Sequence, residues 1–199
     1  MTARIVLVRH GPSAHVVGGV LDHAGVERWR DAYDAAGIQA GARPPEALVR
    51  MTREATHLVA SDMPRALASA EALGTAHEIR VSELFREAPL AIPRWPTRLP
   101  LVVWGTLIHA AWSYRIARGV DETDADRTRA EAASDWLIAL VADASTVVVV
   151  THGVFRRLLG NHLVRRGWTA ARRDGGYRHW SSWSYSRPGQ RDETSTRKT

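Results

Sequence analysis

Four short runs of apolar, mostly β-branched residues constrain the fold of this chain more than any other feature. They lie at residues 4–8, 57–61, 78–82 and 146–150. Short apolar runs of this kind are typical of strands buried on both faces. The segments between them carry apolar residues at helical spacing. This alternation predicts a three-layer α/β/α fold with a mostly parallel central sheet and helices on both of its faces.

The segments between the runs also carry residues that begin and end helices. Pro64 stands in the first turn of one predicted helix, with Asp62 as its candidate N-cap and Gly74 directly after its end. The other helices are predicted over residues 26–37, 44–54, 124–144 and 154–167.

A last segment, residues 177–186, alternates large and small side chains and is predicted to form an edge strand. Trp180 and Trp183 lie three residues apart in it, so they cannot share one strand face without a bulge. We expect both to be packing residues and not a platform for nucleic-acid bases.

The length of 199 residues favours a single domain. We expect that domain to span residues 1–186, with residues 88–119 as a cap or lid and residues 187–199 as a disordered polar tail. A chain of this size buries about 70% of its unfolded surface, so it needs neither a metal nor a disulfide to fold.

Composition narrows the class of partner. The chain has no cysteine, which excludes thiol catalysis and disulfides and fits a cytoplasmic location. Its longest apolar stretch, 99–112, is shorter than the roughly 20 residues of a membrane span, so no membrane partner is expected. The net charge of +6 is spread along the chain. It favours a small anionic partner over nucleic acid, and a homodimer stays possible.

Polar side chains follow the carboxyl end of every predicted strand. In an open parallel sheet, ligands bind beyond these ends. Taken singly, each residue has an ordinary structural explanation; a histidine at a strand end, for example, often bonds only a loop carbonyl. Together they predict an active site for an anion. The residues, in chain order, are Arg9, His10, Ser61, Asp62, Arg65, Glu87, Thr151, His152 and Gly153.

Four motifs occur in an order that resembles the histidine phosphatase (phosphoglycerate mutase-like) superfamily: "RHGPS", "SDMPRALASA", "LFRE" and "VVVVTHG". The resemblance covers residues 4 to about 160. Pro12 and Val16 replace residues common in the family, and the chain lacks the insertion with which true mutases surround their substrate. These departures favour hydrolysis over mutase activity.

The resemblance implies a phosphoric monoester hydrolase that needs no metal or other cofactor and acts on a small phosphorylated molecule. His10 would be the nucleophile and form a phosphohistidine, with its second nitrogen donating to a backbone carbonyl. Glu87 would be the general acid and base. The residues implied to bind the phosphoryl group or the substrate are Arg9, Arg65, His152, Gly11, Ser13 and Gly153.

Two alternatives remain open: a phosphomutase of the same fold, and a non-catalytic binder of a phosphorylated ligand. A binder has no need of Glu87, which disfavours the second. We also expect that basic side chains of the cap and the first loop could contact a second acidic group of the substrate. The candidates are Arg86, Arg94, Arg98, His15 and His23.

Overall fold

The computed structural model describes residues 3–74, 78–89, 91–117, 123–141 and 145–187. Its main sheet has six strands in the order β4-β3-β6-β1-β8-β7. In chain order these strands are β1 (Ala3–Arg9), β3 (His57–Ser61), β4 (Ile79–Ser82), β6 (Thr146–Thr151), β7 (Thr169–Asp174) and β8 (Ser182–Arg187). Strands β4, β3, β6 and β1 are parallel, and β8 runs antiparallel to both of its neighbours. A separate pair joins β2 (Val20–Leu21) to β5 (Leu99–Pro100).

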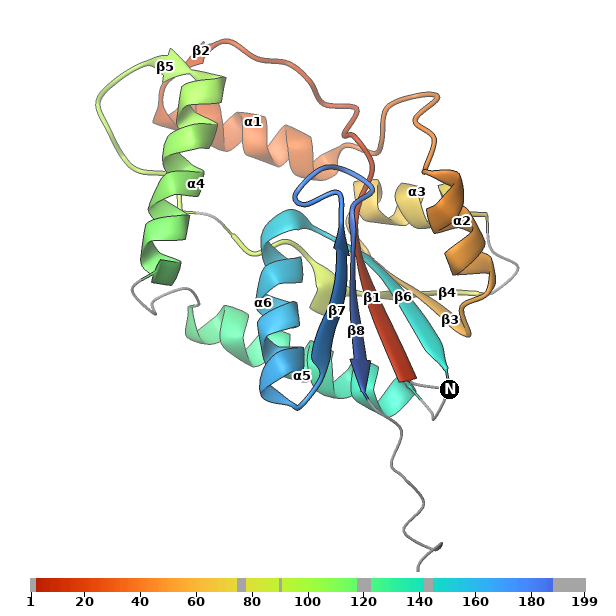
Figure 1. Cartoon of the computed structure of the whole chain (residues 1–199). Helices are drawn as coiled ribbons and strands as arrows, with labels where there is room; N and C mark the ends of the chain where they lie inside the picture. Colours follow the sequence, from red (N-terminus) through yellow and green to blue (C-terminus); the bar gives the residue numbers. More distant parts are fainter. Residues whose placement is uncertain (1–2, 75–77, 90, 118–122, 142–144, 188–199) are drawn as a thin grey trace, which may run out of the picture.

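The helices cover both faces of the main sheet. Helices α5 and α6 pack on one face, and α2 and α3 pack on the other (Figure 1). The three-layer α/β/α fold predicted from the alternating runs is therefore confirmed. The helices are α1 (His23–Ala35), α2 (Glu46–Arg53), α3 (Pro64–Ala72), α4 (Leu101–Ala117), α5 (Asp124–Leu140) and α6 (Gly153–Arg165), with a 3-10 turn, η1, at Glu83–Phe85.

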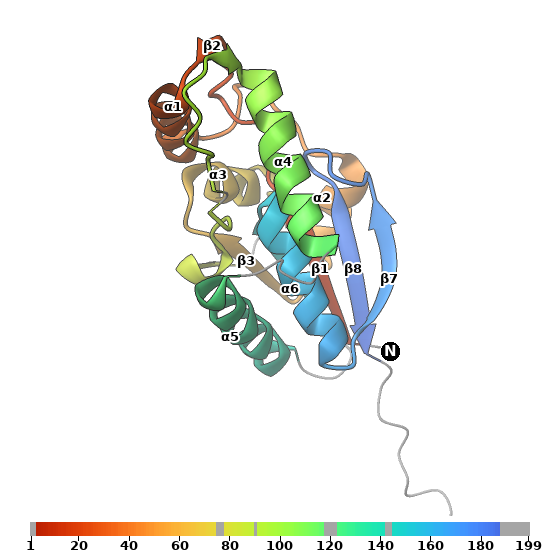
Figure 2. The same cartoon turned by 90° about the vertical axis from the view of Figure 1, so that its left-hand side faces the viewer.

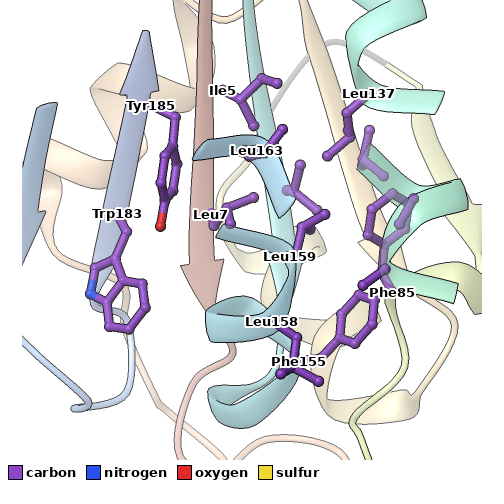
Figure 3. Packing of buried hydrophobic residues seen from close by; sticks show 14 of the residues in the cluster. Ile5, Leu7, Phe85, Leu137, Phe155, Leu158, Leu159, Leu163, Trp183 and Tyr185 are labelled. Atoms are coloured by element: carbon purple, nitrogen blue, oxygen red, sulfur yellow. The ribbon is translucent and has the colours of Figure 1, made fainter. Parts of the chain in front are cut away.

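Strand β1 is buried on both faces, as its sequence predicts. Ile5 and Leu7 point into the core formed with α5 and α6, where Figure 3 shows them beside Leu159 and Leu163. The alternate residues Val6 and Val8 enter the second core, formed with α2 and α3. Because side chains alternate along a strand, β1 is packed on both of its faces. This packing fixes the position of its carboxyl end.

The C-terminal hairpin differs from the prediction. The strand predicted over 177–186 begins only at Ser182 and lies inside the sheet, between β1 and β7. The edge strand on this side of the sheet is β7, whose residues are all exposed. Its sequence, "TAARRD", has no apolar face, so it gave no strand signal. Residues 175–181 consequently form the loop that joins the two strands, and Trp183 packs into the core, as expected of a packing residue.

The start of α3 also differs in detail. Its N-cap is Met63, which makes no side-chain capping bond, and not Asp62. The Asp62 carboxylate instead accepts a hydrogen bond from Nε of Arg86 at 2.8 Å. Gly74 does follow the helix end with a φ of +61°, a left-handed conformation that glycine adopts at little cost.

The segment predicted as a cap contains an irregular stretch, β5 and the apolar helix α4. Figure 1 shows α4 beside the sheet, and Figure 2 shows it running down from β5. Its Trp112 ring centroid lies 5.4 Å from the guanidinium of Arg157 on α6. Trp104 anchors it, because its ring is fully buried and its Nε1 donates to the carbonyl of Leu21 at 2.8 Å. No helix in the described ranges is long and apolar enough to cross a bilayer. Residues 188–199, predicted as a disordered tail, lie outside the described residues, and the domain limits stay a prediction.

The contact between α6 and β8 gives a test of the packing. A Cβ atom on Gly160 would lie 2.1 Å from the Tyr185 hydroxyl. Gly160→Ala must therefore displace either helix α6 or the Tyr185 ring. We expect a loss of about 1–3 kcal/mol in the free energy of unfolding, measured with urea. Gly105→Ala in α4 is the matched control, because nothing lies within 4 Å of its added Cβ. Alanine there should stabilise the helix by up to about 1 kcal/mol. Equal effects at the two positions would contradict the packing described.

Candidate active site

His10 lies directly beyond the carboxyl end of β1 and is 1% exposed. Its Nδ1 is 2.7 Å from the carbonyl oxygen of Gly11. Since a carbonyl can only accept, Nδ1 carries the proton and Nε2 holds a lone pair. That lone pair accepts from Nε of Arg65 at 3.3 Å. Burial, and then the charge of Arg65, hold the pKa of His10 well below its usual value of 6.5. The ring is thus a neutral base with its lone pair directed at a guanidinium.

Arg65 comes from the first turn of α3 and is 1% exposed. Its Nη1 donates to the carbonyl of Tyr33 at 3.1 Å and lies 3.1 Å from a carboxylate oxygen of Asp34. The guanidinium also lies over the Tyr33 ring, 4.5 Å from its centroid. These contacts with the end of α1 hold a planar cation in one orientation, which suits recognition of phosphate oxygens.

His152 follows β6 and is fully buried. Its ring centroid lies 5.1 Å from that of His10, and its Nε2 is 3.0 Å from the hydroxyl of Ser61. Burial, and then His10, hold its pKa well below 6.5. The other ring nitrogen, Nδ1, is buried and has no hydrogen-bond partner among the described residues.

Glu87 lies at the N-terminus of α6, beside His152. Its carboxylate accepts from the backbone N–H groups of Val154 at 3.1 Å and Phe155 at 2.8 Å. These contacts hold Glu87 at the predicted edge of the sheet, against the helix that begins at Gly153, the last residue of the fourth motif.

Arg129 on α5 holds the chain that carries Glu87, and sequence reasoning did not find it. It donates to the carbonyls of Arg86 at 2.5 Å and Glu87 at 3.4 Å, and it pairs with Asp126 at 3.0 Å. In the sequence it is one of several charged residues on a predicted helix, so nothing distinguishes it.

Arg9 and Gly153 lie against each other. A Cβ atom on Gly153 would be 3.5 Å from Nε of Arg9, and that nitrogen is buried without a partner. The guanidinium Nη1 donates to the carbonyl of Tyr177 in the loop between β7 and β8. Arg9 thus has its Nε against Gly153, while its head group contacts that loop.

Gly11 and Ser13 shape the chain after His10. The Gly11 N–H donates to Ser69 at 2.8 Å, and the Ser69 hydroxyl donates to the carbonyl of Arg65 at 2.6 Å. Ser13 is buried, and its hydroxyl accepts from the N–H of His15 at 3.2 Å. Both residues have internal partners, and their contact with substrate stays a prediction.

The β7–β8 loop, residues 175–181, is the part of the site that the sequence did not indicate. Its His179 ring lies 5.5 Å from the His10 ring, between centroids. Its Trp180 ring covers Gly11, where an added Cβ would lie 2.3 Å from Cζ2 of Trp180. A strand predicted through residues 177–186 would have placed these side chains along the sheet and away from His10.

The fully buried Arg156 of α6 holds this loop. It donates to the carbonyl of Ser181 at 2.7 Å, to the Ser181 hydroxyl at 2.9 Å and to the carbonyl of Gly176 at 2.9 Å. Burial, and then Arg9, lower its pKa to about 10, so it stays charged at neutral pH. Nothing in "GVFRRLL" shows which arginine faces inward.

Most of the basic residues considered for a second acidic group are engaged elsewhere. Arg86 pairs with Asp62, and Arg98 donates to the carbonyl of Val20 at 3.2 Å. His23 contacts the carbonyl of Pro93 at 3.1 Å, and His15 lies against the Trp29 ring. Arg94 is exposed. The described residues contain no group of three or more histidine or acidic side chains that could hold a metal ion.

Comparison with known proteins agrees with this geometry. The model of a family described as "Histidine phosphatase superfamily (branch 1)" matches residues 5–191. No curated protein matches the sequence. Among solved structures, a mycobacterial glucosyl-3-phosphoglycerate phosphatase in complex with VO3 is 20% identical, with a TM-score of 0.55, and the match covers 92% of each chain.

Two further solved structures have the same fold. "Mycobacterial hydrolase 1" is 20% identical with a TM-score of 0.54, over 94% of this chain and 92% of the other. A mutant phosphoserine phosphatase from Entamoeba histolytica, bound to phosphoserine, is 12% identical with a TM-score of 0.53, over 91% and 89%. At these identities the likeness concerns the fold.

The buried neutral histidines predict how stability depends on pH. The folded chain holds the pKa of His10 and His152 below 6.5, whereas both titrate near 6.5 when unfolded. Below about pH 6.5 the unfolded chain therefore binds protons that the folded chain does not. Between pH 7 and 5 the free energy of unfolding should fall as pH falls, with a slope of up to about 1.4 kcal/mol per pH unit for each histidine.

Urea unfolding at half-unit steps over that range measures the slope. His152→Gln should remove one histidine's share, whereas His109→Gln, on the exposed surface of α4, should leave the slope unchanged. A flat profile in the parent protein would mean that these rings are not held neutral.

Proposed function

The chain belongs to the histidine phosphatase superfamily, branch 1, and on that premise we propose that it hydrolyses a phosphomonoester through a phosphohistidine on His10. Membership confirms the predicted family and enzyme class, phosphoric monoester hydrolase. The observation that carries the proposed mechanism is the tautomer of His10. Its proton is held on Nδ1 by the Gly11 carbonyl, so Nε2, 3.3 Å from Nε of Arg65, carries the lone pair that would attack phosphorus.

In the first step, Nε2 of His10 forms a bond to phosphorus and the bond from phosphorus to the ester oxygen breaks. The guanidinium groups of Arg9 and Arg65 offset the charge on the transferring phosphoryl oxygens. We assign His152, whose ring centroid lies 5.1 Å from that of His10, as a further contact for one of them. Glu87 donates a proton to the leaving oxygen, which departs as an alcohol.

In the second step, Glu87 takes a proton from water as the water oxygen attacks phosphorus. The bond between phosphorus and Nε2 breaks, inorganic phosphate leaves, and His10 regains its lone pair. The backbone N–H groups of Val154 and Phe155 hold the Glu87 carboxylate in position for both proton transfers.

The rest of the assignment follows from the same site. We propose a small phosphorylated molecule as substrate, no metal requirement and no nucleic-acid partner. A cytoplasmic location and a possible homodimer belong to the proposal too. Hydrolysis is favoured over phosphoryl transfer to a second hydroxyl because the sequence lacks the mutase-type insertion, and Glu87 favours turnover over simple binding. The structural neighbours named for phosphatase activity agree with this class, although family membership carries the argument.

We expect phosphate release from a panel of phosphomonoesters to persist in excess chelator. His10→Ala should abolish it, because the phosphoryl acceptor is gone. Glu87→Gln should lower kcat by about 10²- to 10⁴-fold, the usual worth of general acid and base assistance. Quenching in alkaline denaturant should trap on the parent a phosphoryl adduct that is stable to base, labile to acid and absent in His10→Ala.

Glu46→Gln, on the exposed surface of α2, is the matched control and should retain full activity. Loss of activity on chelation alone would refute a metal-independent reaction. Recovery of an isomeric phosphate ester in place of inorganic phosphate would favour the mutase. If the parent and its variants bind a phosphomonoester stoichiometrically but release no phosphate, the non-catalytic binder would be favoured.

A further inference from the structure

We infer that His179, on the β7–β8 loop, is a substrate-contacting residue that donates a hydrogen bond to an oxygen of the phosphoryl group. The inference rests on the proposed function and adds a residue that lies outside all four motifs. Its ring lies 5.5 Å from the ring of His10, between centroids, at an angle of 47°. A phosphoryl group attacked by His10 therefore falls within hydrogen-bond reach of a side chain at this place.

The charges around His179 support the same position. Partial burial, and then the charge of Arg9, lower the pKa of His179 to about 4. The imidazole is therefore neutral at pH 7, with one N–H to donate.

His179 remains exposed, and no hydrogen bond to its ring nitrogens is found within the described residues. A histidine that only stabilised the loop would be expected to bond to the loop. The side chains around it do so: Arg156 bonds the loop backbone, and Trp180 covers Gly11. Among the loop residues near His10, His179 is therefore the one whose ring nitrogens remain available to a ligand.

Backbone hydrogen bonds between the loop and Arg9 hold this side chain in place. The N–H of Trp180 donates to the carbonyl of Arg9 at 3.1 Å, and the N–H of Arg9 donates to the carbonyl of Ser181 at 3.0 Å. Trp180 has a φ of +61°, a conformation that bulky residues rarely adopt. This turn directs Trp180 onto Gly11 and leaves the preceding side chain beside His10. Strained backbone of this kind persists where the surrounding structure fixes it, often at a binding site.

The test measures binding of orthovanadate, and separately of inorganic phosphate, by calorimetry on the full chain. His179→Phe keeps a ring of similar size without a donor and should weaken binding of both anions at least tenfold. His179→Asn and His179→Gln place an amide N–H near one or the other ring nitrogen, so one of them should recover most of the affinity. The variants should also raise KM more than they lower kcat. Thermal unfolding should be unchanged, which excludes collapse of the loop.

His109→Asn is the control for loss of an exposed histidine and should bind both anions like the parent. Equal affinity in His179→Phe and the parent would overturn the inference while leaving the proposed function intact. Equal losses in all three variants, with no recovery by either amide, would also overturn it, since the ring would then act only through packing. A parent that neither binds these anions nor releases phosphate would overturn the proposed function, and this inference with it.

Discussion

The in-register parallel pairing of β1 with β6 is the constraint on which the rest of the site depends. Arg9 pairs with Thr151, so the residues that follow, His10 and His152, leave the sheet side by side. The N–H of His10 also donates to the carbonyl of Thr151 at 3.0 Å, which extends the pairing to His10. Since β1 is clamped between two apolar cores, a shift of one residue would turn every side chain to the wrong face. Core packing therefore sets the separation of the two rings.

The site also concentrates positive charge. Arg65 and Arg9 act on the pKa of both rings, and within the described residues Asp34 is the carboxylate that pairs with Arg65. The two buried histidines respond by staying neutral, because burial and the guanidinium charges both disfavour protonation. A phosphate dianion entering this site meets fixed cations and neutral donors already in place, so little reorganisation is needed when charge develops on its oxygens.

The sequence predicted the parts of the site that follow doubly buried strands, because apolar runs locate those strands and topology brings their ends together. His10, His152 and Arg65 belong to this group, and the structure brings them together. It could not predict the β7–β8 loop. Strand β7 is exposed on both faces, so its sequence has no periodic pattern of apolar residues. The sequence therefore predicts the following strand, β8, to begin too early and to lie at the edge of the sheet. The inward direction of Arg156 likewise depends on which face of α6 meets the loop, a property of tertiary packing and not of local sequence.

Strand β1 comes first along the chain, yet both of its partners come late. It pairs with Thr146–Thr151 and with Ser182–Arg187, contacts of very high sequence separation. During synthesis the nascent chain therefore carries an apolar strand with two unpaired edges until its last third has emerged. Such strands are slow to pair and prone to aggregate. This edge of the sheet is thus among the last features to assemble, and a chain made only as far as residue 145 has three of the four motifs without the candidate site.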